Sequence, residues 1–219
     1  EGCIVLSLRK MDRVVQIITG DATARLQAGV ILEDAEVALN REGFLLGHDP
    51  WSRPIATVGG AISTNGVGYT AAKYGCMGEQ VLGMEIVLAT GEIVRTRGVP
   101  KASSGPDLDH LFIGSEGTLG VVTEATLKVF PNPEKRLLRA VSFPRFEDGF
   151  QAIVDMYAQG VRPAMVDYGT EGNDEDGEAT LYLSFEGFEA DVEAHEARAM
   201  KVCTRQNGVD LGVREAANF

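Results

Sequence analysis

The sequence has few cysteines, one tryptophan and no long apolar run among its 219 residues. Three widely spaced cysteines exclude a disulfide-stapled scaffold and the paired spacing of a structural zinc site, and they favour a reducing compartment. No apolar run approaches the roughly 20 residues of a membrane-spanning helix. We therefore expect a cytoplasmic protein without an integral membrane segment.

Basic residues are also scarce, since 20 Lys and Arg stand against 32 Asp and Glu, a formal net charge of −12. The acidity is local, because residues 167–196 hold eleven acidic side chains and no Lys or Arg. No basic stripe could neutralise phosphates, so no nucleic-acid partner is expected. The three histidines have no ligands at metal-binding spacing, so no metal site is expected; His110 should pack or cap, and His195 should face solvent.

Glycine is abundant and unevenly placed, with 18 of 26 residues before position 135. This change in texture predicts a boundary between domains at residues 1–132 and 133–219. In the first domain we expect an α+β pattern. Its predicted elements are strands at 3–8, 14–19 and 22–30, a helix at 31–42, a hairpin at 81–88 and 92–96, a helical turn at 107–112, and a strand that alternates at Val122, Ala125, Leu127 and Val129.

The second domain reads as half of an α+β layer. Strands are expected at 137–143 and 180–185, and helices at 146–159 and 189–207. The first of these helices is amphipathic, because Phe146, Phe150, Ile153, Val154 and Tyr157 recur at helical spacing.

Residues 57–78 carry six glycines and no acidic side chain. Such a backbone can approach a ligand closely and turn several N–H groups toward one anion, since Lys73 is the only charge in the stretch. The alternative is a glycine-rich turn between buried segments. The run Gly66–Ala71 fits G-x-G-x-x-A, but no strand precedes it, which argues against a Rossmann fold.

A second glycine-rich segment, residues 113–122 (IGSEGTLGVV), leads into a strongly apolar strand. Two such segments beside buried strands suit a long ligand that crosses several loops, and a dinucleotide such as FAD has that shape. The alternative is two unrelated tight turns.

The runs TVGGAISTNGVG, VLGMEIVLATGEIVRT and SGPDLDHLFIGSEGTLGVVTEATLKV resemble the vanillyl-alcohol-oxidase (PCMH-type) family of FAD-linked oxidases. That family includes D-lactate dehydrogenase, glycolate oxidase and alkylglycerone-phosphate synthase, and the later runs SFPRFEDGFQAI and LYLSFEGFEADVEAHEARAM are most similar to the synthase. The resemblance implies an α+β fold: a PCMH-type FAD-binding domain, mostly its second subdomain, followed by half of an α+β substrate-binding cap.

The resemblance also implies FAD contacts in three segments, while catalytic residues stay unassigned. The hydroxyls of Thr57, Thr64 and Thr118 could donate to phosphate or ribityl oxygens, and His48 should be structural or near the flavin. The implied contacts are Trp51, Ser52, Ile55, Ala56, Thr57, Gly59, Gly60, Thr64, Asn65, Gly66, Val67, Glu116, Gly117, Thr118, Leu119, Gly120, Val121 and Val122.

Departures from the family pattern limit what the resemblance implies. The family's N-terminal pyrophosphate loop, the second half of the cap and its histidines are absent, and Asp167 stands where a substrate-binding arginine is expected. We therefore expect a piece of a longer FAD-dependent oxidoreductase acting on a small hydroxy acid or alcohol. The alternatives are a flavin-dependent transferase like the synthase, or a non-catalytic fragment that keeps only the fold. The electron acceptor and a homo-oligomeric state are left open.

Overall fold

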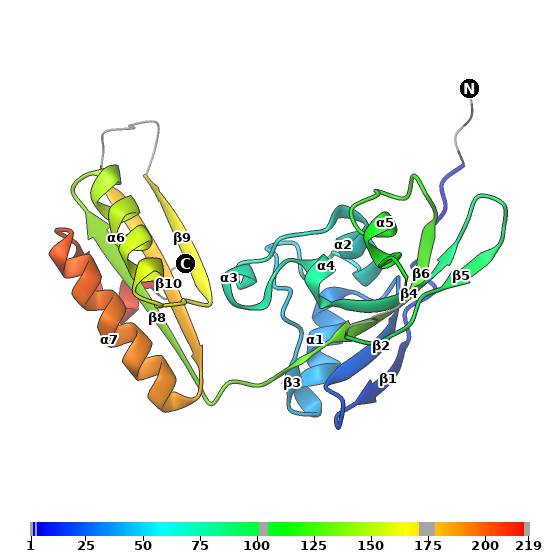
Figure 1. Cartoon of the computed structure of the whole chain (residues 1–219), viewed down its shortest axis with the longest axis horizontal. Helices are drawn as coiled ribbons and strands as arrows, with labels where there is room; N and C mark the ends of the chain where they lie inside the picture. Colours follow the sequence, from blue (N-terminus) through cyan, green and yellow to red (C-terminus); the bar gives the residue numbers. More distant parts are fainter. Residues whose placement is uncertain (1, 3, 101–104, 171–177, 217–219) are drawn as a thin grey trace. The chain divides into compact units, whose positions relative to one another are not determined.

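A computed structural model describes residues 2, 4–100, 105–170 and 178–216, without the side chains of residues 214 and 215. The chain divides into two compact units, residues 1–68 with 74–132 and residues 69–73 with 133–219 (Figure 1). Each unit has its own hydrophobic core, and each combines an antiparallel sheet with helices. The expected α+β class is confirmed.

Unit 1 is built on a five-stranded sheet in the order β1-β2-β6-β4-β5, and every ladder in it is antiparallel. This arrangement differs from a parallel Rossmann sheet. Its strands are β1 (Val14–Ile18), β2 (Thr23–Gln27), β4 (Val81–Val87), β5 (Ile93–Arg95) and β6 (Val121–Lys128), and β3 (Phe44–Leu45) pairs separately with β7 (Phe130–Pro131). The helices of this part of the chain are α1 (Leu32–Arg41), α2 (Val58–Thr64), α3 (Ala71–Tyr74), α4 (Met77–Gln80) and α5 (Asp109–Phe112).

The core of unit 1 lies where α1 and α2 pack on one face of the sheet. Leu32, Ala35 and Leu39 recur at helical spacing and are buried, as the sequence predicted for this helix. The helix ends at Glu42, and Gly43 follows in the left-handed conformation at φ 81°.

A β-bulge in β6 explains the uneven alternation of its buried residues. Glu85 pairs with Glu124 but Ile86 pairs with Val122, so the register shifts at Thr123. In a regular strand Val122 and Ala125 would point to opposite faces of the sheet. The extra residue of the bulge turns both side chains to the same face, and both are buried in the core.

The strand expected at residues 3–8 is not formed over the described residues 4–8. Ile4 is 98% exposed, and the segment runs free at the N-terminus of unit 1 (Figure 1). The apolar run has strand propensity, but a strand needs a neighbouring edge to pair with. Only near Leu8 does the chain return to the unit, where the Met11 amide donates to the Leu8 carbonyl at 2.8 Å.

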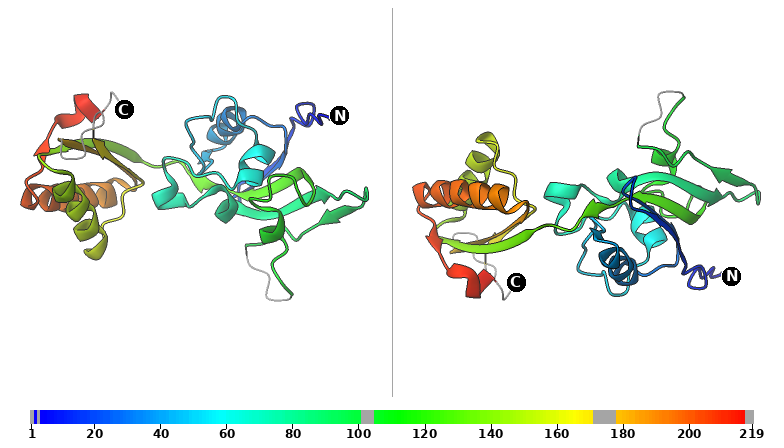
Figure 2. Two further views of the ribbon diagram at one scale, coloured as in Figure 1. Left: turned by 90° about the horizontal axis from the view of Figure 1, so that it is seen from above. Right: turned by 90° about the horizontal axis from the view of Figure 1, so that it is seen from below.

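Unit 2 has a four-stranded antiparallel sheet in the order β11-β8-β10-β9. Helices α6 and α7 cover one face of the sheet and α8 lies on the other (Figure 2). The elements are β8 (Lys135–Phe143), α6 (Phe146–Ala158), β9 (Met165–Thr170), β10 (Ala179–Gly187), α7 (Glu189–Arg205), β11 (Val209–Asp210) and α8 (Gly212–Ala216).

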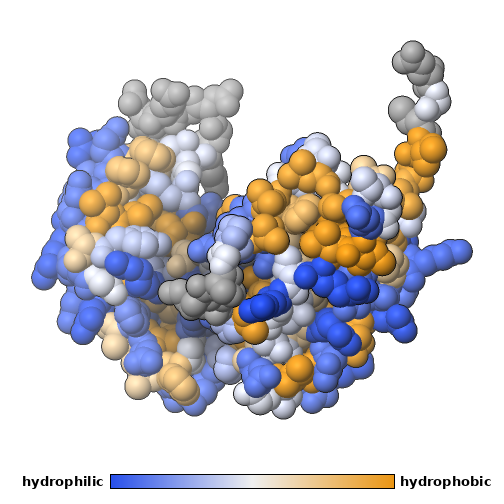
Figure 3. Space-filling view, turned by 45° about the vertical axis from the view of Figure 1, so that its right-hand side comes forward, coloured by the Kyte–Doolittle hydropathy of each residue, from blue (hydrophilic) through white to orange (hydrophobic). Residues whose placement is uncertain are grey.

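The aromatic stripe of α6 lies outside the core of unit 2. Phe150 is 55% exposed, whereas Gly149, Ala152 and Met156 are buried. A Cβ on Gly149 would lie 2.3 Å from the hydroxyl of Tyr168, so only a small residue allows the helix to pack this closely on the sheet. The helix itself is as predicted, and Ile153 of its expected face packs against the core, but Phe150 and Val154 are exposed. Exposed apolar side chains are not confined to α6, and the hydropathy colouring of Figure 3 shows others on the surface.

This arrangement makes a prediction for α6. The substitution Met156→Ala should lower the free energy of unfolding by about 2–5 kcal/mol, because it leaves a cavity in the core. Phe150→Ala should cost about 1 kcal/mol or less, because the ring is largely in solvent. Urea unfolding of both variants measures the difference, and an equal cost for the two would contradict the assigned face.

Candidate functional site

The two glycine-rich segments meet at one cavity in unit 1. The cavity has a volume of about 320 Å³. It is lined by Leu8, Arg9, Gly29, Thr57, Gly59, Gly60, Ser63, Gly117, Gly120, Val121 and Val122. Backbone bonds hold the segments together, because the Gly114 amide donates to the Ile62 carbonyl at 3.0 Å and the Glu116 amide to the Ser63 carbonyl at 2.9 Å. Residues some fifty positions apart therefore share one binding surface.

The first segment is fixed against the sheet by its own amides. The Val58 amide donates to the Val30 carbonyl at 2.9 Å, and the Gly59 amide donates to the Ala28 carbonyl at 2.8 Å. The Gly60 amide donates to the Thr57 hydroxyl oxygen at 3.2 Å. These three amides are therefore bonded within the protein and are not available to an anion.

The second segment leaves some of its backbone donors without an acceptor in the described residues. Glu116 and Gly117 adopt positive φ angles of 51° and 78°. Within the described residues the amides of Gly117 and Leu119 have no protein acceptor. A Cβ on Gly117 would meet nothing within 4 Å, so this backbone borders open space at the cavity. It can approach a ligand closely.

Gly120 has a different role from Gly117. A Cβ there would lie 2.6 Å from Cγ2 of Ile86 and 3.1 Å from the Val87 carbonyl oxygen. Both glycines line the cavity, and Gly120 in addition packs closely against β4. Gly59 resembles it, since its Cβ would lie 2.7 Å from that of Ala28.

Of the three threonine hydroxyls expected to reach a ligand, two are bonded to nearby carbonyls. Thr64 donates to Gly60 at 3.1 Å, and Thr118 donates to Ser115 at 2.7 Å. Thr57 lines the cavity and accepts from Gly60, which leaves its hydroxyl proton able to donate.

The remaining expected contacts do not line this cavity. Residues 51–56 form an exposed turn, with Trp51 83% and Ile55 76% exposed, and Arg53 ties the turn to Glu33 at 2.6 Å and to Asp49 at 2.9 Å. After α2, Asn65 adopts φ 48°, and its side-chain oxygen accepts from the Gly78 amide at 3.0 Å.

Four residues of the lining, Leu8, Arg9, Gly29 and Ser63, are not among the contacts expected from the sequence, and Arg9 is the charged one. No motif marks it, and the strand expected at residues 3–8 obscured the turn that carries it. Arg9 is the one charged side chain among the described residues that line the cavity. Lys73, which the analysis singled out as the charge of the glycine stretch, is not part of that lining.

His48 lies beneath Gly66 and is 2% exposed. A Cβ on Gly66 would be 3.1 Å from Cε1 and Nε2 of the imidazole. Burial lowers the pKa of His48 below its ordinary value of 6.5, against a smaller opposing effect of Asp49. A neutral imidazole therefore packs against the backbone at Gly66.

The other two histidines lie outside the cavity. His110 is exposed and faces Asp107 at 3.2 Å instead of packing. His195 was expected to face solvent but is half-buried, with a buried Nδ1. Across the described residues no group of three or more His, Cys, Asp and Glu side chains could hold a metal ion.

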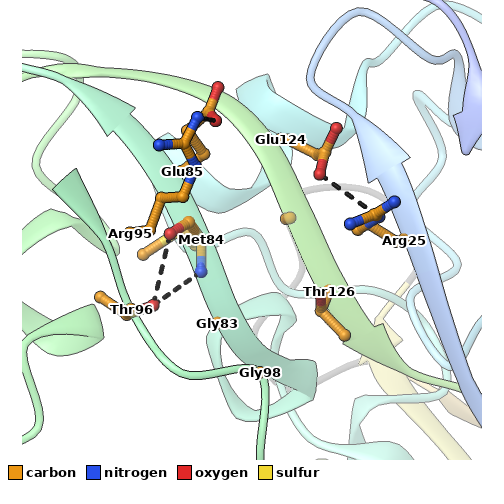
Figure 4. A pocket seen from close by; sticks show the side chains of 10 residues that line it. Arg25, Gly83, Met84, Glu85, Arg95, Thr96, Gly98, Glu124 and Thr126 are labelled. Atoms are coloured by element: carbon orange, nitrogen blue, oxygen red, sulfur yellow. Dashed lines mark hydrogen bonds and ion pairs between the residues drawn. The ribbon is translucent and has the colours of Figure 1, made fainter. Parts of the chain in front are cut away.

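A second cavity of about 230 Å³ lies on the opposite face of the sheet (Figure 4). Its charges are paired, with Arg25 to Glu124 at 3.4 Å and Arg95 to Glu85 at 2.5 Å. A hydrogen bond from Thr123 and the neighbouring Arg95 lower the pKa of Glu85. The two arginines of this surface are therefore paired with carboxylates, which distinguishes it from the first cavity.

Two glycine-rich segments meet at one cavity, and the second brings backbone donors that have no acceptor among the described residues. Such a site suits a ligand with anionic groups. Residues 1–97 match the FAD binding domain family. The chain is similar to PCMH-type FAD-linked oxidases, and FAD is indicated as the cofactor.

Particular relatives agree with this assignment. The chain is 35% identical to glycolate oxidase subunit GlcD of Bacillus subtilis, over 96% of this chain and 48% of the relative. It is 38% identical to D-lactate dehydrogenase of Archaeoglobus fulgidus, over 89% of this chain and 46% of the relative. A solved structure of alkyldihydroxyacetonephosphate synthase matches 93% of this chain and 42% of its own, at a TM-score of 0.84 and 26% identity. The chain thus spans less than half of each relative. In the described part, no helix has the length and apolar character needed to cross a membrane.

Gly120 offers a test of the packing that shapes the cavity. Gly120→Ala should lower the free energy of unfolding by about 1–3 kcal/mol, because the new methyl group overlaps Ile86. The control is Gly20→Ala, whose methyl group would meet nothing within 4 Å. Denaturant unfolding with no difference between the variants would contradict the close contact.

His48 makes the stability of unit 1 depend on pH. Because the folded-state pKa lies below the unfolded value of 6.5, the folded protein binds fewer protons, and stability falls as the pH drops through this range. We expect His48→Gln to lose less stability than the original protein between about pH 7 and about pH 5. Thermal unfolding across this range measures the effect, and parallel curves would contradict it.

Proposed function

We propose that the protein is an FAD-dependent oxidoreductase that acts on a small hydroxy acid or alcohol. Two similar proteins carry the names glycolate oxidase and D-lactate dehydrogenase, and both names refer to small 2-hydroxy acids. FAD, when bound, accepts the electrons removed from the substrate. On this proposal residues 1–132 bind the cofactor and residues 133–219 form part of the substrate-binding cap.

The observation that carries the proposal is the cavity between α2 and the 117–122 segment. At about 320 Å³ it lies at the lower end of the roughly 300–1,000 Å³ of small-molecule pockets, so it fits a part of a dinucleotide. The backbone of Gly117 and the hydroxyl of Thr57 would hold that part. Residues 51–56 and 64–67 are proposed to contact the rest of the cofactor.

These residues bind and orient the cofactor and do not transfer protons themselves. The bonds from the Val58 and Gly59 amides to the Val30 and Ala28 carbonyls keep one wall of the cavity in place. His48, neutral and buried, supports the neighbouring Gly66. Such prearranged contacts reduce the entropy lost when the ligand binds.

A second candidate is a flavin-dependent transferase of the alkyldihydroxyacetonephosphate synthase kind. The observation that favours it is the match of 93% of this chain to that enzyme's structure. The two candidates differ in net electron transfer. Anaerobic mixing with glycolate or D-lactate should bleach the flavin's visible absorbance if the protein is the oxidoreductase, whereas persistent absorbance with every hydroxy acid tested would favour the transferase.

The cofactor site itself is tested by two glycines in the same backbone conformation. Gly117 and Gly91 have φ of 78° and 85°, and a Cβ at either meets nothing within 4 Å, but only Gly117 lines the cavity. Each change to Ala should cost about 1 kcal/mol of stability through backbone strain. We expect Gly117→Ala to lower FAD content at least about tenfold and Gly91→Ala to leave it unchanged. FAD content per protein is read from the absorbance of purified variants. Full FAD in Gly117→Ala would contradict the site.

A further inference from the structure

Arg9 is a cation that the described structure leaves without a counter-ion. It is exposed at the cavity, and no ion pair to it occurs among the described residues. The described lining of the cavity contains no carboxylate. An unpaired guanidinium beside a cavity without acidic groups can attract an anion, and it forms stronger hydrogen bonds to phosphate than a neutral donor does.

The turn that carries Arg9 is held tightly against the end of β2. The Met11 amide donates to the Leu8 carbonyl at 2.8 Å, and the Gly29 amide donates to the Met11 carbonyl at 2.8 Å. A Cβ on Gly29 would lie 2.1 Å from the Leu8 carbonyl oxygen, so the turn rests directly on a glycine backbone. The backbone of Arg9 is therefore fixed at the cavity, although the residues before it run free.

Other donors surround the same space. The hydroxyls of Thr57 and Ser63 belong to the lining, as does Gly117, whose amide has no acceptor in the described part of the chain. Arg9 faces these groups from a third segment. A cation, two hydroxyls and an amide donor around one space fit a ligand group that only accepts hydrogen bonds.

We propose that Arg9 binds the phosphate-bearing part of the dinucleotide cofactor. The proposal rests on the proposed function, because it assigns one part of FAD to one part of that site. It adds a binding residue outside both glycine-rich segments. The glycine backbone gives the cofactor room, and Arg9 supplies the charge.

The test compares Arg9→Gln with Lys10→Gln in the full-length protein, after its flavin has been removed. Both residues are exposed cations in the same turn, but Lys10 does not line the cavity. We expect Arg9→Gln to raise the FAD dissociation constant about tenfold, as for the loss of a charged hydrogen bond, and Arg9→Lys to recover part of it. Lys10→Gln should change it less than about twofold.

Two further measurements separate charge from a general loss of structure. Added salt should weaken FAD binding more in the original protein than in Arg9→Gln, because salt screens the lost attraction. Inorganic pyrophosphate should compete with FAD in the original protein and much less in Arg9→Gln. Unchanged FAD affinity in Arg9→Gln, an equal loss in Lys10→Gln, or no competition by pyrophosphate would each overturn the role of Arg9. Failure of the original protein to bind FAD at all would instead overturn the proposed function.

Discussion

The site depends on the close contact of glycine backbone with the sheet of unit 1. Gly59 lies against Ala28 and Gly120 against Ile86, and a Cβ at either glycine would be less than 3 Å from its neighbour. One segment packs beside the end of β2 and the other against β4, on either side of β6, and both line one cavity. A side chain at either position would push a wall of the cavity outward. The glycines that shape the site are therefore distinct from Gly117, whose backbone faces the open space.

The two glycine-rich segments on either side of the cavity differ in their hydrogen bonding. The amides of the α2 segment are bonded within the protein, whereas some amides of the second segment have no acceptor in the described residues. Amides of residues 58–60 bond to carbonyls and to a hydroxyl of the protein, which makes the α2 wall rigid. Amides of Gly117 and Leu119 have no such acceptor in the described parts of the chain, and Arg9 stands nearby without an ion pair. The opposite face of the sheet shows the contrast, since Arg25 and Arg95 there are already paired with glutamates.

Much of the fold was predictable, because its signals are local. The helix at 32–41 and the hairpin around Gly91 follow from periodicity and turn chemistry. The two glycine-rich segments were recognisable by composition, and FAD by resemblance to a family. Contacts between distant residues were not predictable. Arg9 lies at the cavity because Leu8 rests on Gly29, some twenty residues away.

The same reason explains the errors. The run at 4–8 has strand propensity but finds no partner strand among the described residues. On α6 the aromatic residues were expected to form the buried face. Tyr168 instead lies so close to the helix that only glycine fits at position 149, and Phe150 is exposed. In both cases the local sequence has the expected propensity, but contacts with distant residues determine whether a strand forms and which face of the helix is buried.

The most direct test of the central claim is a crystal structure of the FAD-loaded protein. The account predicts cofactor density in the cavity between Thr57 and Gly117, with a phosphate group within hydrogen-bonding distance of Arg9. FAD bound elsewhere, for example in the groove beside Arg25 and Glu124, with the first cavity free of cofactor, would contradict it.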